Sequence, residues 1–427
     1  MVLLCGRFSI PLEITRQQRL DVKRMEQTSE DIMAYTLTRD ALKLDLYAAY
    51  HMAKRHKSRK HYVRVFERRL DENLQEICDA LFDRQYTPEP SSCFIVERPK
   101  KREVFAAQFR DRVVHHLYYN YTHALFERTF IQDSYSCIKG RGTHYGIERL
   151  KHHILAESRN YQRRCWVMSL DIRGYFMHID RQILLDIAIN SIRKMATHKV
   201  TIDGDATFGD ILDIDFICWL TEQIVLLDPK RSCKIAGSPS DWDGLDKNKS
   251  LFHTPDGCGL PIGNLTSQLL SNVYLNEFDQ FCKRKLHCKH YGRYVDDAYV
   301  VSHNKEWLLS LIPQMDEFLR ERLHLEIHRG KTQIREARYG AEFLGGFAKP
   351  YRTYMSHSAV GRLKASIRRL PKNDRWQLFR SINAMLGVMS HFDSYRLRKK
   401  LFCIERFTKY GYFNDDMTIY TLYPKTE

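Results

Sequence analysis

Apolar residues recur with helical spacing in the first part of the chain and with strand spacing further on. The pattern predicts mostly helix over residues 30–86, two strands at 93–97 and 102–108 joined by a basic turn, and a helix over 110–130. The apolar positions that carry the first helical spacing are Leu70, Leu74, Ile77 and Leu81. Both kinds of element are therefore expected in the first third of the chain.

Three stretches in the middle of the chain carry the patterns on which the functional interpretation depends. An apolar run that reads as a buried strand ends at Asp171. Residues 290–304 read HYGRYVDDAYVVSHN, and their aromatic and β-branched types predict a short hairpin with Asp296 and Asp297 at or near its turn. In residues 259–281, two glycines permit a close loop, and apolar residues then recur every fourth position as on a helix face.

The rest of the chain divides into an irregular middle and a helical end. Residues 198–258 are rich in turn-forming sequences, with a helix predicted over 208–227 inside them. From Arg362 onward, basic positions interleave with apolar ones, which predicts a small helical domain with a cationic face.

Composition narrows the class of protein. The chain has 427 residues, 43% of them hydrophobic, so it can bury a large core in two or three domains. Its net charge of +16 is spread along the whole length, which favours a polyanion as partner. The 11 cysteines are scattered without a C-x-x-C pair, which indicates reduced thiols in the cytosol and neither a disulfide framework nor a zinc site.

Two kinds of segment are not expected from the sequence. No stretch approaches the roughly 20 apolar residues of a membrane span, so no membrane association is predicted. The first ten residues, MVLLCGRFSI, lack the features of a signal peptide, and Met25 is an alternative to Met1 as the working start.

The acidic residues suggest a metal site if the strand that ends at Asp171 and the hairpin at 290–304 are neighbours in one sheet. Asp171 would then meet Asp296 across one sheet, where like charges repel and lose hydration. Divalent cations compensate such a cluster, and two ions roughly 4 Å apart can activate a hydroxyl and stabilise a leaving pyrophosphate. The simpler alternatives are a helix cap at Asp171 and a polar turn at the Asp pair.

YVDD after a tyrosine-rich strand, with DIRGYF upstream, resembles the palm of a reverse transcriptase, and the similarity extends over residues 90–400. The resemblance implies an α+β right-hand polymerase with fingers, palm (antiparallel sheet plus helices) and a helical thumb. It also implies that Asp171, Asp296 and Asp297 hold two Mg²⁺ ions, for which Mn²⁺ can substitute, together with the backbone carbonyl of Ile172. The implied domains are an N-terminal helical extension (1–88), fingers (89–165), palm with the irregular insertion (166–345), and thumb with C-terminal tail (346–427).

Other segments resemble further motifs of this family, in the family's order. The basic turn and the helix after it resemble the fingers of group II intron type enzymes, which assigns Arg102 to the triphosphate with help from Lys100 or Lys101. Phe176 takes the place of the aromatic gate that excludes a ribose 2′-hydroxyl. The remaining assignments are Lys139 and Arg141 on the template, Lys331 facing the pyrophosphate, Phe343, Leu344 and Gly345 as the primer grip, and Lys364 and Arg368 on the duplex.

One motif points to a subgroup. Most reverse transcriptases have Gln before the second glycine of the 259–281 motif and Ser-Pro at its end, whereas this chain has Ile262 before Gly263, and Gln268 in place of the proline. The sequence IGNLTSQ resembles the reverse transcriptases of diversity-generating retroelements. Membership would imply error-prone copying at template adenines, with Ile262, Gly263 and Gln268 beside the nucleotide.

That membership would also imply the surroundings in which the protein works. The implied partners are a template RNA, an RNA/DNA primer duplex, deoxynucleoside triphosphates and a small basic accessory protein that forms an oligomer. The implied setting is the cytoplasm of a bacterium, with the gene of bacterial or phage origin.

Three alternatives stay open. The first is a faithful or defence-associated enzyme related to retrons or group II introns, although no extra maturase or endonuclease domain is evident after residue 400. The second is a non-catalytic RNA-binding scaffold, which would require a missing carboxylate. The third is an RNA-templated RNA polymerase, against which Phe176 argues.

Overall fold

The computed structural model describes residues 35–98, 100–201, 204–371 and 374–424; the helical prediction for 30–34 and the choice between Met1 and Met25 lie outside them. The helices are α2 (Arg39–Lys54), α3 (His61–Glu67), α4 (Leu70–Phe82), α5 (Phe109–Glu127), α6 (Thr143–Glu157), α7 (Tyr175–His178), α8 (Arg181–Ala196), α9 (Ile214–Val225), α10 (Leu265–Gln280), α11 (Lys305–Leu323), α12 (His357–Arg368), α13 (Arg375–Met389), α14 (Tyr395–Phe402) and α15 (Glu405–Thr408). The strands are β1 (Ser92–Val96), β2 (Arg102–Ala106), β3 (Trp166–Asp171), β4 (Lys234–Ile235), β5 (His290–Tyr294), β6 (Asp297–Ser302), β7 (Gln333–Glu336), β8 (Ala341–Phe343), β9 (Gly346–Lys349), β10 (Arg352–Met355), β11 (Gly411–Phe413) and β12 (Tyr420–Leu422).

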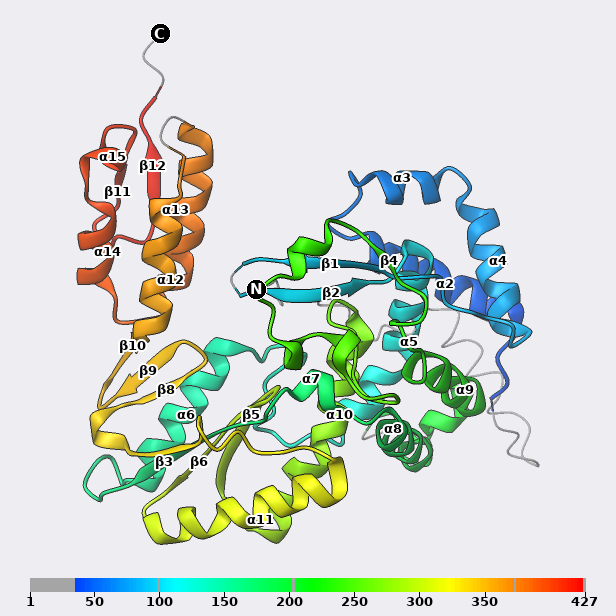
Figure 1. The fold of residues 1–427 in the computed structure, drawn as a ribbon, viewed down its shortest axis with the longest axis horizontal. Coiled ribbons are helices and arrows are strands. Elements are labelled where there is room, and N and C mark those ends of the chain that lie inside the picture. The colour runs from blue at the N-terminus through cyan, green and yellow to red at the C-terminus, as the bar shows by residue number, and fades with distance from the viewer. Residues whose placement is uncertain (1–34, 99, 202–203, 372–373, 425–427) are drawn as a thin grey trace.

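A four-stranded antiparallel sheet in the order β5-β6-β3-β7, the palm sheet, lies at the lower left of the molecule in Figure 1. Its strands alternate between two cores, as the period of two in a strand requires. Met168, Leu170 and Val300 belong to the large core shared with α8, α10 and α11, whereas Val167 and Val301 face a second core with α6. Because both faces are covered, the two central strands, β3 and β6, are largely apolar between their polar ends.

The predicted helical region before residue 86 and the helix after the first hairpin are confirmed. Helix α4 buries the expected stripe of Leu74, Ile77 and Leu81. Helix α5 is enclosed by α2, α8, α9 and α10, so more than half of its residues are buried, polar ones among them. Its buried Asp111 accepts hydrogen bonds from the Tyr86 hydroxyl at 2.7 Å and from the Glu89 backbone N–H at 2.9 Å, which ties the helix to the chain entering β1.

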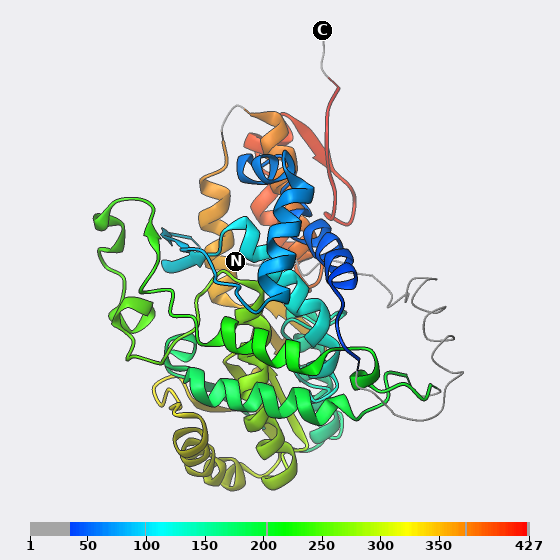
Figure 2. The same ribbon diagram turned by 90° about the vertical axis from the view of Figure 1, so that its right-hand side faces the viewer.

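The irregular segment 228–258 is attached to the β1–β2 hairpin by one buried carboxyl group. Glu103 of β2 is 1% exposed and accepts hydrogen bonds from Trp242 Nε1 at 2.7 Å, from the Ser250 hydroxyl at 2.9 Å and from the Leu251 backbone N–H at 2.6 Å. Strand β4 adds to the hairpin by pairing in parallel with β1. Figure 2 shows this green segment standing beside the hairpin, away from the helices.

The helix predicted over 208–227 begins later than expected. Residues Phe208–Asp210 form a 3-10 turn whose Thr207 and Asp210 cap each other, and α9 starts only after Asp213, which accepts the Phe216 N–H at 2.8 Å. Two local caps therefore divide a stretch that apolar spacing alone describes as continuous.

The C-terminal region has its own core, formed by α12 to α15 with the hairpin β11–β12, and it rises on the opposite side of the palm from α2 to α4 (Figure 1). A three-stranded sheet of order β10-β9-β8 connects it to the palm sheet. The predicted boundary at residues 345 and 346 falls at the turn between β8 and β9, so this sheet spans it. No described helix combines the length and apolar character needed to cross a membrane.

We predict that Glu103→Gln loosens segment 228–258. The amide cannot accept all three hydrogen bonds, and a buried donor without a partner costs about 1–3 kcal/mol. The free energy of unfolding in urea should fall by about this amount, and proteolytic cleavage within the segment should accelerate. Glu97→Gln is the matched control, because Glu97 is 64% exposed and forms an ion pair with Lys101 at the surface. Equal cleavage rates in the parent and Glu103→Gln would contradict the anchoring role.

Candidate active site

Three carboxyl groups gather at one end of the palm sheet. Strands β3 and β6 pair so that Asp171 lies directly opposite Asp297, and Asp296 occupies the turn just before β6. In the strand register Asp171 thus pairs with Asp297 and not with Asp296, while the charge of Asp171 acts on both members of the Asp pair. All three side chains lie at this end of the central strands, which is called the acidic edge below.

The turn that carries Asp296 has an unusual backbone. Tyr294 pairs with Asp297, so Val295 and Asp296 form the two-residue loop, and Val295 has φ +56°. Glycine or asparagine is the usual residue in this left-handed region, and a β-branched side chain there is strained. Such strain persists only where the surrounding structure holds it, and it concentrates at functional sites.

Reduced hydration, and after it mutual repulsion, makes the charged carboxylates unfavourable at the acidic edge. Burial raises the pKa of Asp296, and the neighbouring Asp171 raises it further. The pKa of Asp297 rises to about 7 through reduced hydration and the charges of Asp296 and Asp171. Lys331 partly offsets this repulsion, since its Nζ lies 2.8 Å from Asp171 Oδ2. The site thus favours additional positive charge.

The donor set suits hard divalent cations, which prefer carboxylate and carbonyl oxygens. On either side of Ile172 the chain bonds to the segment 326–328: the His328 N–H donates to the Asp171 carbonyl, and the Arg173 N–H donates to the Glu326 carbonyl. The Ile172 carbonyl therefore faces away from this segment and toward β6. Within the described ranges, no three His, Cys, Asp or Glu side chains converge on one point as they stand. An ion at Asp171 would replace the Lys331 ammonium there.

The β1–β2 hairpin, called the fingers hairpin below, supplies positive charge facing the acidic edge. Arg102 is exposed at the start of β2 and lowers the pKa of Asp296, while Lys100 lowers that of Asp297. Lys101 is turned elsewhere, since its Nζ donates to the Asp243 carbonyl at 2.7 Å and lies 3.1 Å from Glu97. Of the two lysines considered for the triphosphate, Lys100 has the better position.

Phe176 and Ile262 lie in one small apolar cluster between the fingers hairpin and the palm. They pack, each partly exposed, against the buried Phe105 and Met177. The Ile262 carbonyl accepts the Phe105 N–H at 2.9 Å. Gly263 adopts φ +127°, and a Cβ there would approach Val104 Cγ1 to 2.9 Å, so only glycine permits this close approach to β2.

The remaining assigned residues lie on α10, on the loop before α6, on the β8–β9 turn and on α12. Gln268 is exposed on the first turns of α10 and accepts from Cys137 Sγ at 3.5 Å, next to the exposed Lys139. Arg141 donates to the Ile131 and Ser134 carbonyls at 3.2 and 3.0 Å, so it fixes its own loop. Phe343 is buried, Leu344 and Gly345 form the β8–β9 turn with positive φ, and Lys364 and Arg368 are exposed on α12.

A family model described as reverse transcriptase (RNA-dependent DNA polymerase) matches residues 97–346, which is well over half of the chain. The chain belongs to the reverse transcriptase family. It is an RNA-directed DNA polymerase with a right-hand arrangement of fingers, palm and thumb, and members of this family use divalent metal ions.

Individual relatives of this reverse transcriptase are distant. Protein YkfC of Escherichia coli (strain K12) is 23% identical in an alignment of 356 positions that covers 75% of this chain and 81% of that protein. Similar solved structures include apo telomerase from Candida tropicalis, with TM-score 0.45 and 10% identity over 76% of this chain. Another is telomerase from Candida albicans with a fragment of telomeric RNA, with TM-score 0.44 and 10% identity over 75% of this chain. This chain covers 61% and 57% of those two telomerase chains.

Two features of the reverse transcriptase site were not apparent from the sequence. Glu103 reads as an exposed position of a hairpin, and its partners lie 139–148 residues away in the chain. The left-handed Val295 breaks the residue preference of such turns, so no local signal predicts it.

Metal binding should be visible as a change in stability. Magnesium that binds only the folded state raises the melting temperature of the parent, and Asp296→Asn should lose most of that increase. In chelator at about pH 8, Asp296→Asn should be at least as stable as the parent, because the raised pKa of Asp296 makes its charged form unfavourable in the fold.

The difference in stability between Asp296→Asn and the parent should also depend on pH. The stability difference should vanish below about pH 4, where the carboxyl group is protonated in both the folded and the unfolded state. Differential scanning calorimetry measures both effects, with the fully exposed Asp205→Asn as the matched control. Equal magnesium stabilisation in the parent and Asp296→Asn would remove Asp296 from the metal site.

Proposed function

We propose that this reverse transcriptase belongs to a diversity-generating retroelement and copies its template RNA with errors at adenines. The observation that carries the proposal is Ile262, an aliphatic residue where most of the family has glutamine. Its side chain packs with Phe176 and Met177 beside the acidic edge, where an amide would offer hydrogen bonds to a nucleotide or template base. An apolar wall constrains base pairing less, which supports relaxed selection.

In the proposed reaction the side chains have separate tasks. Asp171, Asp296 and Asp297, with the Ile172 carbonyl, hold two magnesium ions, for which manganese can substitute. Bound there, the ions would activate the primer 3′-hydroxyl and stabilise the leaving pyrophosphate. Arg102 and Lys100 bind the triphosphate from the fingers, since a guanidinium matches phosphate oxygens. Lys331, which pairs with Asp171 in the free protein, moves to contact the pyrophosphate when the ions bind.

The same proposal covers selection and duplex binding. Phe176 lies beneath the sugar and excludes the ribose 2′-hydroxyl, so deoxynucleotides are preferred. Phe343, Leu344 and Gly345 hold the primer end, and Lys139 with Arg141 borders the template. The exposed Lys364 and Arg368 of α12 contact the backbone of the RNA/DNA duplex, whose A-form shape is recognised through phosphates.

The proposed cellular context follows from the same resemblance. The enzyme would work in the cytoplasm of a bacterium, with a small basic accessory protein that forms an oligomer. A faithful or defence-associated reverse transcriptase is the second candidate, because the same fold and carboxylates serve both. Fidelity at template adenines distinguishes the two.

The first experiment is primer extension on an RNA template with magnesium or manganese. We expect the parent to incorporate deoxynucleotides far better than ribonucleotides, and Asp296→Asn to lose incorporation. The parent should misincorporate opposite adenine much more often than opposite the other three bases. Uniform fidelity over all four bases would sink the retroelement proposal, and a preference for ribonucleotides would refute the role of Phe176.

The second experiment isolates Ile262. Ile262→Gln restores the amide, so its misincorporation opposite template adenine should fall severalfold while errors at other bases change little. Ile262→Val keeps an aliphatic wall and should retain the parental spectrum. Sequencing of the complementary DNA measures both variants, and identical spectra for the parent and Ile262→Gln would exclude Ile262 as the cause.

A further inference from the structure

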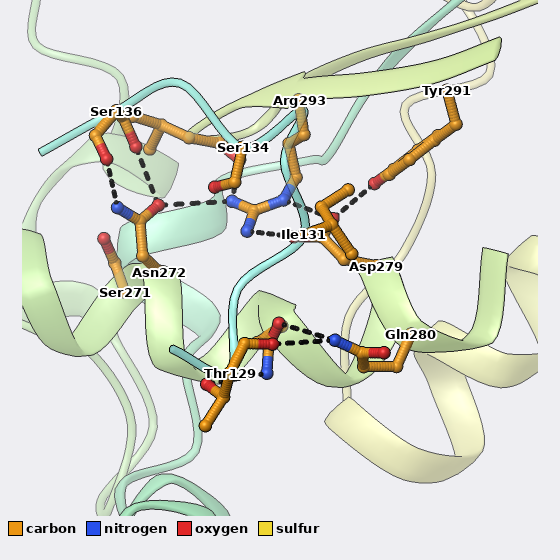
Figure 3. Close-up of polar contacts among 12 residues, drawn as sticks. Thr129, Ile131, Ser134, Ser136, Ser271, Asn272, Asp279, Gln280, Tyr291 and Arg293 are labelled. Atoms are coloured by element: carbon orange, nitrogen blue, oxygen red, sulfur yellow. Dashed lines mark hydrogen bonds and ion pairs between the residues drawn. The ribbon is translucent and has the colours of Figure 1, made fainter. Parts of the chain in front are cut away.

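Arg293 of β5 is a fully buried cation just ahead of the two-residue turn Val295–Asp296, called the catalytic turn below. Its guanidinium makes a two-pronged contact with Asp279 of α10, Nε to Oδ1 at 2.7 Å and Nη2 to Oδ2 at 2.6 Å (Figure 3). The Tyr291 hydroxyl adds a third hydrogen bond to Asp279 Oδ1 at 2.6 Å. Among ion pairs of the described residues, this pair alone has both side chains at 0% exposure.

The third nitrogen of this guanidinium reaches the turn. Arg293 Nη1 donates to the Val295 carbonyl at 2.9 Å. Val295 is the strained residue of the two-residue loop, and its carbonyl carbon is bonded to the backbone nitrogen of Asp296. A rigid planar cation, itself fixed by Asp279, thereby restrains the peptide group from which the Asp296 side chain projects.

The same residue also orders the segment on the template side. The Arg293 backbone N–H donates to the Asp133 carbonyl at 2.9 Å, and its carbonyl accepts the Tyr135 N–H at 3.0 Å. Arg293 Nη1 also lies 3.3 Å from Asn272 Oδ1, and the Asn272 amide exchanges two hydrogen bonds of 2.7 Å with Ser136 (Figure 3). Helix α10, the segment ahead of Lys139 and the catalytic turn thus share one anchor.

We propose that Arg293 is a positioning residue of the polymerase: through Asp279 and the Val295 carbonyl it sets where the Asp296 carboxylate stands. The inference rests on the proposed assignment of Asp296 as a metal ligand. Lysine cannot replace the arginine, because one ammonium cannot span Asp279, Asn272 and the Val295 carbonyl in fixed directions. Loss of this support should impair the chemical step and metal binding more than nucleotide affinity.

The test compares Arg293→Lys with Arg181→Lys. Arg181 is likewise buried, donates to the Leu227 carbonyl at 2.8 Å and pairs with Asp228 at 3.3 Å, but does not touch the turn. Both variants should lose stability. Single-nucleotide incorporation should fall about 10- to 100-fold in Arg293→Lys, the range found when support of metal ligands is removed. Its dNTP dissociation constant should stay near the parental value, and Arg181→Lys should keep the parental rate.

Manganese binding, followed by electron paramagnetic resonance without substrate, gives a readout independent of activity. Arg293→Lys should bind Mn²⁺ more weakly than the parent and Arg181→Lys equally well. If Arg293→Lys does not fold, Tyr291→Phe serves instead, because it keeps the ion pair and removes one hydrogen bond to Asp279. Its incorporation rate should fall about 2- to 10-fold, the equivalent of one hydrogen bond.

The outcomes separate two failures. If Asp296→Asn keeps the parental rate, the assignment of Asp296 is wrong. If Asp296→Asn is inactive but a folded Arg293→Lys, or Tyr291→Phe in its place, retains the parental rate and Mn²⁺ affinity, only the positioning role is overturned. An equal loss of rate in Arg181→Lys would also overturn it, since any buried arginine would then have the same effect.

Discussion

The buried pair of Arg293 and Asp279 is the constraint on which the active site depends. Removing two charges from water costs several kcal/mol for each ion, and the cost is recovered only where the partners and their remaining hydrogen bonds are well placed. Here the Arg293 guanidinium nitrogens and both Asp279 oxygens are engaged, and one nitrogen extends to the carbonyl of Val295. A shift of the hairpin relative to α10 would leave a buried charge unpaired, at about 3–5 kcal/mol. The fold thus permits one position of the catalytic turn.

The acidic edge and the basic surface depend on each other. Burial and the charge of Asp171 raise the pKa of Asp296, and burial with the charges of Asp296 and Asp171 raises that of Asp297, so the charged forms of this pair need cations nearby. Lys331 supplies one from the palm, and the fingers hairpin faces the edge with further positive charge. The segment attached to the hairpin through Glu103 holds that side of the fingers in place. A net charge of +16 then serves the nucleic acid, while the local negative charge serves the chemistry.

The sequence predicted those elements that side-chain periodicity and turn residues determine locally. The hairpin around YVDD, the strand that ends at Asp171 and the helix after Gly263 all follow from side-chain periodicity and turn chemistry, and they appear as predicted. What could not be predicted depends on partners remote in the chain. Arg293 in a strand reads as an exposed basic position until Asp279 is found opposite it. The exact register also escaped, because periodicity places Asp171 near the Asp pair without saying which member faces it.

The restrained hairpin should bring Asp296 to Asp171 for metal-assisted DNA synthesis on RNA. Anomalous scattering from manganese can locate the ions in crystals of the protein with an RNA/DNA duplex and an incoming deoxynucleotide. We expect manganese within about 2.5 Å of carboxylate oxygens of both Asp171 and Asp296. Manganese bound away from either carboxylate, with duplex and nucleotide in place, would contradict it.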